Sequence, residues 1–348
     1  MSIETALKNI NLEPAERWGH TEYSLDYHTE YLTERTGVSS DDEHFTRAVR
    51  DRFAYDFIWS INNGLIIWGD AGRVTDMGHA SYAADGSDHR INRESPFTSP
   101  EDVWNFDAVE EYGLPDLDAQ VKAYEDIVIK GRTDFPGQLK TGGYYRTIVS
   151  GAIASFGWEM LLVGCSDPVK MEKVFDSFFR RTLFFMKAWA ETSAEVMIQH
   201  DDFVWTSGAF MSPDIYREII IPRYAEMWKP IHEAGKKVLF CSDGNIMEFA
   251  GDIVEAGADG LIFEPCNDFE TLVKEFGKTV CLVGSCVDCR DLTFGKQEKF
   301  ISDVDRTFEL LERYSKGAIL AVGNHLPSNI PAEMLDLYFD RILPKLEK

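Results

Sequence analysis

The chain has 348 residues, of which 35 are Lys or Arg and 59 are Asp or Glu, so its formal net charge is −24. Such an acidic chain lacks the clustered cations that phosphate contacts need, which excludes nucleic acid as a partner class. With 44% hydrophobic and 13% aromatic residues, the chain can bury a large core, and intrinsic disorder is excluded.

The sequence also predicts no membrane partner. The longest apolar stretch, residues 148–163, is interrupted by Glu159 and is too short to span a bilayer. The first ten residues are polar and do not form a signal peptide. The cysteines are too sparse for a disulfide scaffold, which predicts reduced thiols in a cytoplasmic protein. They are Cys165, Cys241, Cys266, Cys281, Cys286 and Cys289.

The first 130 residues are uneven in pattern. We expect residues 1–60 to form an N-terminal extension of helices and loops. One apolar run, Gly64 to Trp68, predicts a buried strand that ends in a turn at Asp70. Ser99 and Pro100, followed by two acids, predict the start of a helix.

From Gly142 onward, apolar runs alternate with amphipathic segments. The amphipathic segments predict helices over 212–234, 245–256 and 296–313, the first of them broken at Pro222 and Pro230. Alternating units of this length indicate a parallel sheet and favour a closed β/α barrel over an open one. The predicted strands are Arg146–Gly151, Glu195–His200, Lys237–Cys241, Gly260–Phe263, Val280–Gly284 and Ala318–Val322.

Polar and reactive side chains follow the ends of these strands. Because the carboxyl ends of parallel strands meet on one rim of a barrel, we expect these side chains to converge there as an active site. The opposite strand ends carry no comparable collection. The rim residues are Asp70, Asp202, Cys241, Asp243, Glu264, Cys286 and His325.

The thiols, acids and imidazole of this rim are a plausible ligand set for zinc. We expect about one Zn²⁺ per chain, held by Cys241 with help from His325 and one further ligand. That ligand is Cys286, Glu264 or Asp243, and a core position without reactivity remains the alternative for both cysteines. The other four cysteines are interpreted as structural.

Three rim acids are candidates for catalysis: Asp202, Asp70 and Glu264. His200, Asp201 and Asp202 are neighbours, and side chains alternate along a strand, so only some of them can face the pocket. We favour Asp202 because it is nearest the loop. Helix capping is the alternative for acids such as Asp243, which precedes a predicted helix. Rim tryptophans could line a wall for a flat ligand, with core packing as the alternative for each; they are Trp68, Trp158 and Trp205.

Several ordered motifs resemble the uroporphyrinogen decarboxylase superfamily. They lie at residues 201–203, 208–214, 221–224, 232–245, 287–295 and 323–333. The resemblance covers residues 140–348 well and the first part weakly. It implies a distorted (β/α)8 TIM barrel, formed by residues 1–348 as one domain with 1–60 as its N-terminal extension.

The superfamily contains two main activities. Its decarboxylases use an aspartate after a strand, which Asp70 would match, and an N-terminal arginine motif that grips substrate carboxylates. That arginine motif is absent here, so we expect negligible tetrapyrrole decarboxylation. The other branch transfers methyl groups to or from a corrinoid, and its thiol-methylating members bind zinc through a His-x-Cys pair and a later Cys. At the three matching positions this chain has Cys241, Asp243 and Asn324.

We therefore predict a zinc-assisted methyltransferase component that works with a separate corrinoid protein carrying the cobalamin. The chain lacks the corrinoid-binding motif Asp-x-His-x-x-Gly. Its other partner would be a small methyl donor, and the rim tryptophans favour an aryl methyl ether, as for an O-demethylase. The alternatives are a cofactor-independent decarboxylase of the uroporphyrinogen type and a barrel that only binds a ligand. A homodimer is compatible with the sequence.

Overall fold

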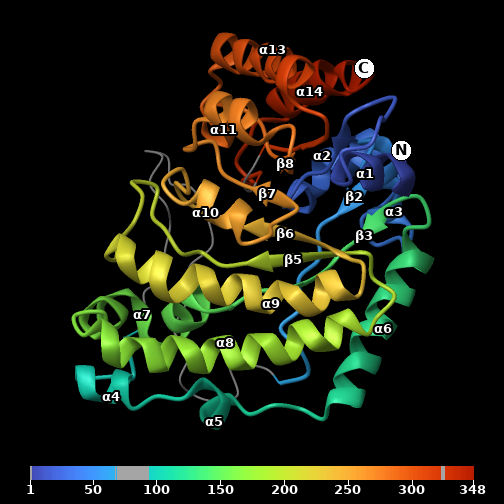
Figure 1. The fold of residues 1–348 in the computed structure, drawn as a ribbon. Helices are drawn as coiled ribbons and strands as arrows, with labels where there is room; N and C mark the ends of the chain where they lie inside the picture. Colours follow the sequence, from blue (N-terminus) through green and yellow to red (C-terminus); the bar gives the residue numbers. More distant parts are fainter. Residues whose placement is uncertain (1, 67, 69–93, 323–325) are drawn as a thin grey trace.

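A computed structural model describes residues 2–66, 68, 94–322 and 326–348. Parallel strands alternate with helices along the chain (Figure 1). The strands of the described part are β1 Gly19–His20, β2 Phe57–Ile58, β3 Leu139–Lys140, β4 Gly142–Tyr144, β5 Val196–His200, β6 Lys237–Cys241, β7 Gly260–Ile262, β8 Cys281–Val283 and β9 Ala318–Leu320.

Helices surround these strands. Those before β5 are α1 Ile3–Ile10, η1 Leu25–Tyr27, α2 Thr29–Thr36, α3 Phe45–Arg52, α4 Pro100–Trp104, α5 Ala108–Tyr112, α6 Leu117–Asp134, α7 Val149–Gly164 and α8 Pro168–Ala190. Those after β5 are η3 Ile215–Ile220, α9 Ile221–Glu233, α10 Ala250–Glu255, α11 Phe269–Phe276, α12 Cys289–Thr293, α13 Gln297–Tyr314, α14 Ala332–Ile342 and η4 Leu343–Lys345.

The sheet closes into a barrel. Seven strands pair in parallel in the order β1-β9-β8-β7-β6-β5-β4, and β2 pairs in parallel with β3. Only Thr141 separates β3 from β4, so the two count as one strand of the barrel. The remaining gap lies between β1 and β2. It is closed by the N–H of Asp56, which directly precedes β2 and donates to the carbonyl of His20 in β1 at 2.9 Å. The barrel therefore has eight strands, and the predicted (β/α)8 barrel is confirmed.

The barrel interior has its own apolar core. Side chains that alternate along the strands point inward, and α1 closes the amino-terminal end of the barrel with Ala6 and Ile10. The inward residues of the strands include Val196, Ile198, Leu239, Cys241, Ile262, Cys281, Val283 and Ile319. A second, larger core lies between the strands and the helices outside them.

Two predicted strands are wrong. Within the run 146–151, α7 begins at Val149, because the Asp201 carboxylate accepts the Val149 and Ser150 N–H groups at 3.2 and 2.6 Å and so caps this helix. The strand precedes it at Gly142–Tyr144. The run 64–68 is no strand in its described residues: Gly64 has φ +89°, and the Leu65 N–H donates to the Gln120 side chain at 2.9 Å. Phe57–Ile58 takes that place in the barrel.

Most predicted helices are present. Ser99 caps α4 through a reciprocal capping box with Asp102, and α13 matches the segment 296–313. The helix expected over 212–234 is divided near Pro222 into the π-helix η3 and the α-helix α9, while Pro230 lies inside α9. The helix expected over 245–256 is shorter, since α10 spans only Ala250–Glu255.

Candidate metal and active site

The carboxyl ends of β5 and β6 bring together the best candidate site among the described residues. His200 and Cys241 are register partners in this strand pair. Because Ile198 and Leu239 point into the barrel, the alternation also points His200 and Cys241 inward at its mouth. Asp202 and Asp243 lie two residues further along the chain, just past the ends of these strands.

His200, Asp202 and Asp243 form a group that could hold a metal ion. Each offers one ligand atom, and these atoms lie within 4.8 Å of one another. In this state His200 Nε2 lies 2.8 Å from Asp202 Oδ1, which also accepts the Asp243 N–H at 3.0 Å. We call these three residues the rim triad.

Asp201 and Asp202 have different partners although they are neighbours. The Asp201 carboxylate is buried, caps α7 and accepts a hydrogen bond from the Tyr224 hydroxyl at 2.7 Å. Asp202 belongs to the rim triad and accepts a hydrogen bond from the Tyr145 hydroxyl at 3.0 Å. The Tyr145 ring also packs on the His200 imidazole with 4.4 Å between centroids. Tyr145 therefore holds both members of the ion pair in place.

Two members of the triad, His200 and Asp202, form an ion pair. Burial works to lower the pKa of His200, but the Asp202 carboxylate and the Cys241 thiol together outweigh it and raise that pKa well above its usual value. Burial likewise works to raise the pKa of Asp202, yet His200 and the hydrogen bonds it accepts leave that pKa lowered. At neutral pH the pair is imidazolium and carboxylate. Burial raises the pKa of the nearby Cys241 to about 11, so Cys241 is a neutral thiol.

The donor set of the triad fits a divalent metal. Imidazole nitrogen and carboxylate oxygen are both zinc ligands, and mixed nitrogen and oxygen donors also suit other first-row metals. Ligation requires a neutral imidazole, so a metal must displace the proton that Asp202 now stabilises. The Cys241 thiol is an additional soft donor beside the triad, because Cys241 is the register partner of His200 and helps to raise the pKa of its imidazole.

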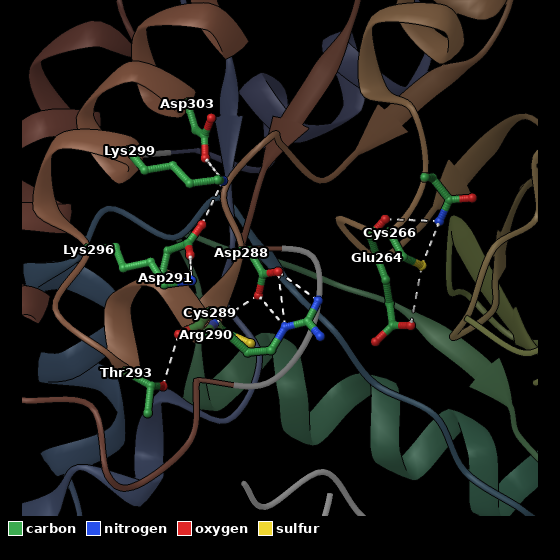
Figure 2. A network of polar contacts seen from close by, with 11 residues as sticks. Glu264, Cys266, Asp288, Cys289, Arg290, Asp291, Thr293, Lys296, Lys299 and Asp303 are labelled. Carbon is green, nitrogen blue, oxygen red and sulfur yellow. Dashed lines mark hydrogen bonds and ion pairs between the residues drawn. The ribbon is translucent and has the colours of Figure 1, made fainter. Parts of the chain in front are cut away.

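The other predicted site residues lie in different surroundings. A Glu264 carboxylate oxygen accepts the Gly244 N–H at 2.5 Å, and Gly244 directly follows the triad member Asp243. The same carboxylate lies 4.0 Å from the Cys266 thiol (Figure 2). Cys286 lies against α13, where its N–H donates to Thr307 at 3.0 Å, and burial raises its pKa to about 11. Among the described residues it does not join the triad. Asp70 and His325 lie outside the described residues.

Figure 2 also shows a charged network around α12. Asp288 caps this helix and is gripped by the Arg290 guanidinium, with Nη2 2.7 Å from Oδ2. Asp291 is 3% exposed and pairs with Lys296 and Lys299 at 2.9 and 2.7 Å. The buried carboxylate of Asp291 is therefore compensated by two cations, which is a structural role.

The three rim tryptophans do not form one wall. Trp158, Trp205 and Phe210 pack together with ring centroids 5.0 to 5.7 Å apart, and Trp205 is 41% exposed. The Trp205 carbonyl accepts the Asn245 N–H at 2.8 Å, which ties this cluster to the loop of Asp243. Trp68 is buried elsewhere, 4.4 Å from the Tyr112 ring. We call Trp158, Trp205 and Phe210 the aromatic cluster.

The structural interpretation of two other cysteines agrees with their surroundings. Cys281 is fully buried in the barrel core, and the Cys165 thiol lies 3.3 Å from the Met211 sulfur. In the part of the chain that the structure describes, no helix is long and apolar enough to cross a bilayer.

The sequence profile of the uroporphyrinogen decarboxylase (URO-D) family matches residues 158–342. The chain belongs to this family. The matched region includes β5, β6, the rim triad and the aromatic cluster. None of the curated proteins matches the chain.

Solved structures support the fold. A methyltransferase from Methanosarcina mazei is similar over 98% of both chains, with a TM-score of 0.64 and 17% identity. At this identity the likeness establishes the barrel fold shared by the two proteins. A GH113 beta-1,4-mannanase is similar over 91% of both chains, with 13% identity and a TM-score of only 0.41.

Sequence reasoning passed over His200, although one signal pointed to it. The predicted strand ended at His200, and the inward alternation from Val196 through Ile198 continues to this position. The local capping task of Asp201, by contrast, depends on α7, whose start was predicted as a strand. Without that helix, only the position of Asp202 nearest the loop distinguished it from Asp201.

Proposed function

We propose that this URO-D family protein is a metal-assisted methyltransferase that transfers a methyl group between a small donor and a corrinoid on a partner protein. The observation that carries the proposal is the rim triad at the carboxyl ends of β5 and β6. In β/α barrels this end holds the chemistry. The fold shared with a methyltransferase from Methanosarcina mazei supports the reaction type.

In this proposal His200, Asp202 and Asp243 hold the metal, with Cys241 as the adjacent thiol. A bound Zn²⁺ supplies Lewis acidity toward a donor oxygen or thiol. Tyr145 orients Asp202 through its hydroxyl and supports the His200 ring from one face. The Asp243 N–H, which donates to Asp202, fixes the spacing between the two strand ends. These contacts preorganise the ligands before the metal arrives.

The donor would be an aryl methyl ether. The exposed Trp205 ring and its neighbours Trp158 and Phe210 offer flat apolar surface, and aromatic rings pack well on such surfaces. Asn245, whose N–H binds the Trp205 carbonyl, is two residues from Asp243. The aromatic cluster would therefore hold the ring of the donor on the side of Asp243.

Metal binding tests the triad directly. We expect about one zinc per chain by elemental analysis, and a dissociation constant for Zn²⁺ weakened by about tenfold or more in His200→Gln and in Asp243→Asn. His232→Gln is the matched control, because His232 also pairs with an aspartate, Asp259, at 3.0 Å. Asp259 directly precedes β7, so this pair lies at the opposite end of the barrel. Unchanged zinc affinity in both triad variants would place the metal elsewhere.

Methyl transfer is tested separately. Methoxybenzene or a methoxyphenol is incubated with the zinc-loaded protein and free cob(I)alamin, and formation of methylcobalamin is followed by its absorbance. We expect product from the wild-type protein and at most about one hundredth of that rate from His200→Gln. Release of CO₂ from uroporphyrinogen, with no methyl transfer from any ether, would instead identify a decarboxylase.

A further inference from the structure

Two arginines lie against the ring of Trp68, away from the rim triad. The guanidinium carbon of Arg181 is 4.8 Å from the ring centroid, and that of Arg146 is 5.5 Å from it. Arg181 comes from α8, while Arg146 follows β4 by two residues. Among the residues that the structure describes, no carboxylate pairs with either guanidinium. In a chain of net charge −24, two such cations against one ring require an explanation.

Arg181 is the more unusual of the two because it is only 1% exposed. Its Nη1 donates to the Tyr144 hydroxyl at 2.5 Å, while its Nε and Nη2 are buried and make no hydrogen bond. Cation–π contacts with Trp68, Tyr112 and Phe185 compensate part of the desolvation. They leave the two N–H groups unsatisfied, and buried unsatisfied donors on a charged group are costly.

The two unsatisfied nitrogens lie on one edge of the guanidinium. Nε–H and the neighbouring Nη2–H point the same way and form the fork that binds the two oxygens of a carboxylate or phosphate. The same edge is filled in Arg35, whose Nε and Nη2 donate to the two oxygens of Asp336 at 2.8 and 2.5 Å. In Arg181 this edge has no oxyanion from the described chain.

Arg146, the other cation against the Trp68 ring, is held in a strained backbone conformation. Its φ is +54°, a left-handed value that a residue with a long side chain rarely adopts. The neighbours on both sides fix this backbone: the Tyr145 hydroxyl donates to Asp202, and the Thr147 hydroxyl donates to the His200 carbonyl at 3.1 Å. Its Nε is also buried without a hydrogen bond. Strain that the surroundings enforce is typical of binding sites.

We propose that Arg181 and Arg146 form a site for an oxyanion, a carboxylate or phosphate group, with the Arg181 fork as its principal contact. The inference rests on the proposed function in one respect: it makes the methyl donor an anionic compound. Arg146 directly follows Tyr145, which contacts two residues of the rim triad, so one short segment connects the oxyanion site with the metal site. The unpaired cations would also attract an anion that the net charge of the chain repels.

Isothermal titration of the metal-free full-length protein tests the site, with sodium benzoate and inorganic phosphate as separate probes at constant ionic strength. We expect one of the two to bind, benzoate if the site is built for a carboxylate and phosphate if it is built for a phosphoryl group. Arg181→Met and Arg146→Met should each weaken that binding by about tenfold or more. Arg181→Lys keeps the charge but lacks the fork, so it should lose most of the affinity as well.

Arg35→Met is the matched control, because it removes the same charge from an arginine whose fork is already filled by Asp336. Its binding should stay within about twofold of wild type. The proposal is overturned if neither probe binds, or if Arg181→Met binds as tightly as wild type. If Arg181→Met does not fold, Arg146→Met decides by the same criterion. Because the titration uses neither metal nor methyl transfer, its failure leaves the triad standing, and loss of zinc binding leaves this site standing.

Discussion

Asp201 and Asp202 illustrate how much one residue of chain can change the task of a carboxylate. Asp201 accepts the first N–H groups of α7 and the Tyr224 hydroxyl, and these neutral donors stabilise the fold. Asp202 accepts from Tyr145 and pairs with His200 in a position open to a metal. The prediction that Asp202 faces the site rests on its position nearest the loop, since strand alternation shows only that not all three neighbouring side chains can face the pocket. The different roles of the two carboxylates depend on contacts of Asp201 with α7 and Tyr224, and no local sequence pattern predicts those contacts.

The ion pair makes the stability of the protein depend on pH. A His whose pKa is raised in the folded state contributes stability that is complete below its unfolded pKa of about 6.5 and is lost as pH rises through the folded value. An Asp whose pKa is lowered contributes above about 3.9 and loses that contribution as pH falls. Both contributions are therefore present together between roughly pH 4 and 6.5.

We predict that Asp202→Asn removes this dependence. Without the carboxylate, the pKa of His200 should fall, because the effect of burial is then opposed much less strongly. The difference in melting temperature between wild type and variant should be largest near pH 5 to 6, about 2–4 °C for each kcal/mol lost, and should narrow above pH 7. Thermal melts from pH 5 to 9 measure this, and NMR titration of His200 measures its pKa.

Tyr145→Phe serves as the control for that experiment. It removes one hydrogen bond to Asp202 but keeps the carboxylate and its pairing with His200. We expect its melting temperature to differ from that of wild type by a constant amount, while the pH dependence persists. A difference between wild type and Asp202→Asn that is the same at every pH would show that the two side chains are not an ion pair.

At the scale of elements, α7 is bent by a single residue. Gly157 has φ +74° and ψ +166°, which is not helical, and the segment on either side is helical. This combination is essentially confined to glycine because a Cβ would clash with the backbone. Trp158 follows immediately and belongs to the aromatic cluster. The break therefore sets the direction in which the second half of α7 carries this ring toward Trp205.

We predict that Gly157→Ala lowers the free energy of unfolding by about 1–3 kcal/mol, because alanine is strained in this conformation. Urea unfolding followed by circular dichroism measures the loss. Gly251→Ala is the matched control: Gly251 lies inside α10, and a Cβ there meets no atom within 4 Å. That substitution should be neutral or stabilise by up to about 1 kcal/mol. Equal effects at the two positions would refute the role given to the break.

Helices and strands were predictable where their periodic apolar pattern extended over many residues. The helix α13 has eighteen residues with a strong apolar face, and its bounds nearly match the prediction. The strand β4 was missed because it contains Gly142 and Gly143, which have little strand propensity. Both glycines are required by packing: a Cβ on Gly142 would lie 2.5 Å from Met197, and one on Gly143 would lie 2.7 Å from the Ile198 carbonyl oxygen.

At the scale of the whole molecule, the alternation after Gly142 was sufficient to predict a parallel barrel. The way in which the barrel closes was not predictable. Residues 1–60 were expected to form an extension, and they also supply the two-residue strands β1 and β2. Two residues carry no periodic pattern, so only the contacts of distant segments define them as strands. Closure therefore rests on tertiary hydrogen bonds from the beginning of the chain to its end.

Asn9 is one of the residues that join these two ends. It is fully buried in α1, and its side chain donates to the Arg17 carbonyl at 3.0 Å and accepts the Ala318 N–H of β9 at 3.2 Å. The approach is close, because a Cβ on Gly317 would lie 1.9 Å from the Asn9 carbonyl oxygen. Helix α1 is thereby fixed against the amino-terminal end of the barrel, where Ala6 and Ile10 cover the inward side chains.

We predict that Asn9→Ala destabilises the whole barrel and not α1 alone. The Ala318 N–H and the Arg17 carbonyl would lose their side-chain partner in a buried place, at a cost of about 2–4 kcal/mol in total. The urea midpoint should fall while unfolding remains a single transition, and amide exchange in β9 should accelerate. Asn11→Ala, at an exposed position two residues along, should change stability by less than about 0.5 kcal/mol. If Asn9→Ala loosened α1 but left the midpoint of the barrel unchanged, α1 would be a peripheral helix, and closure would depend on the strand hydrogen bonds alone.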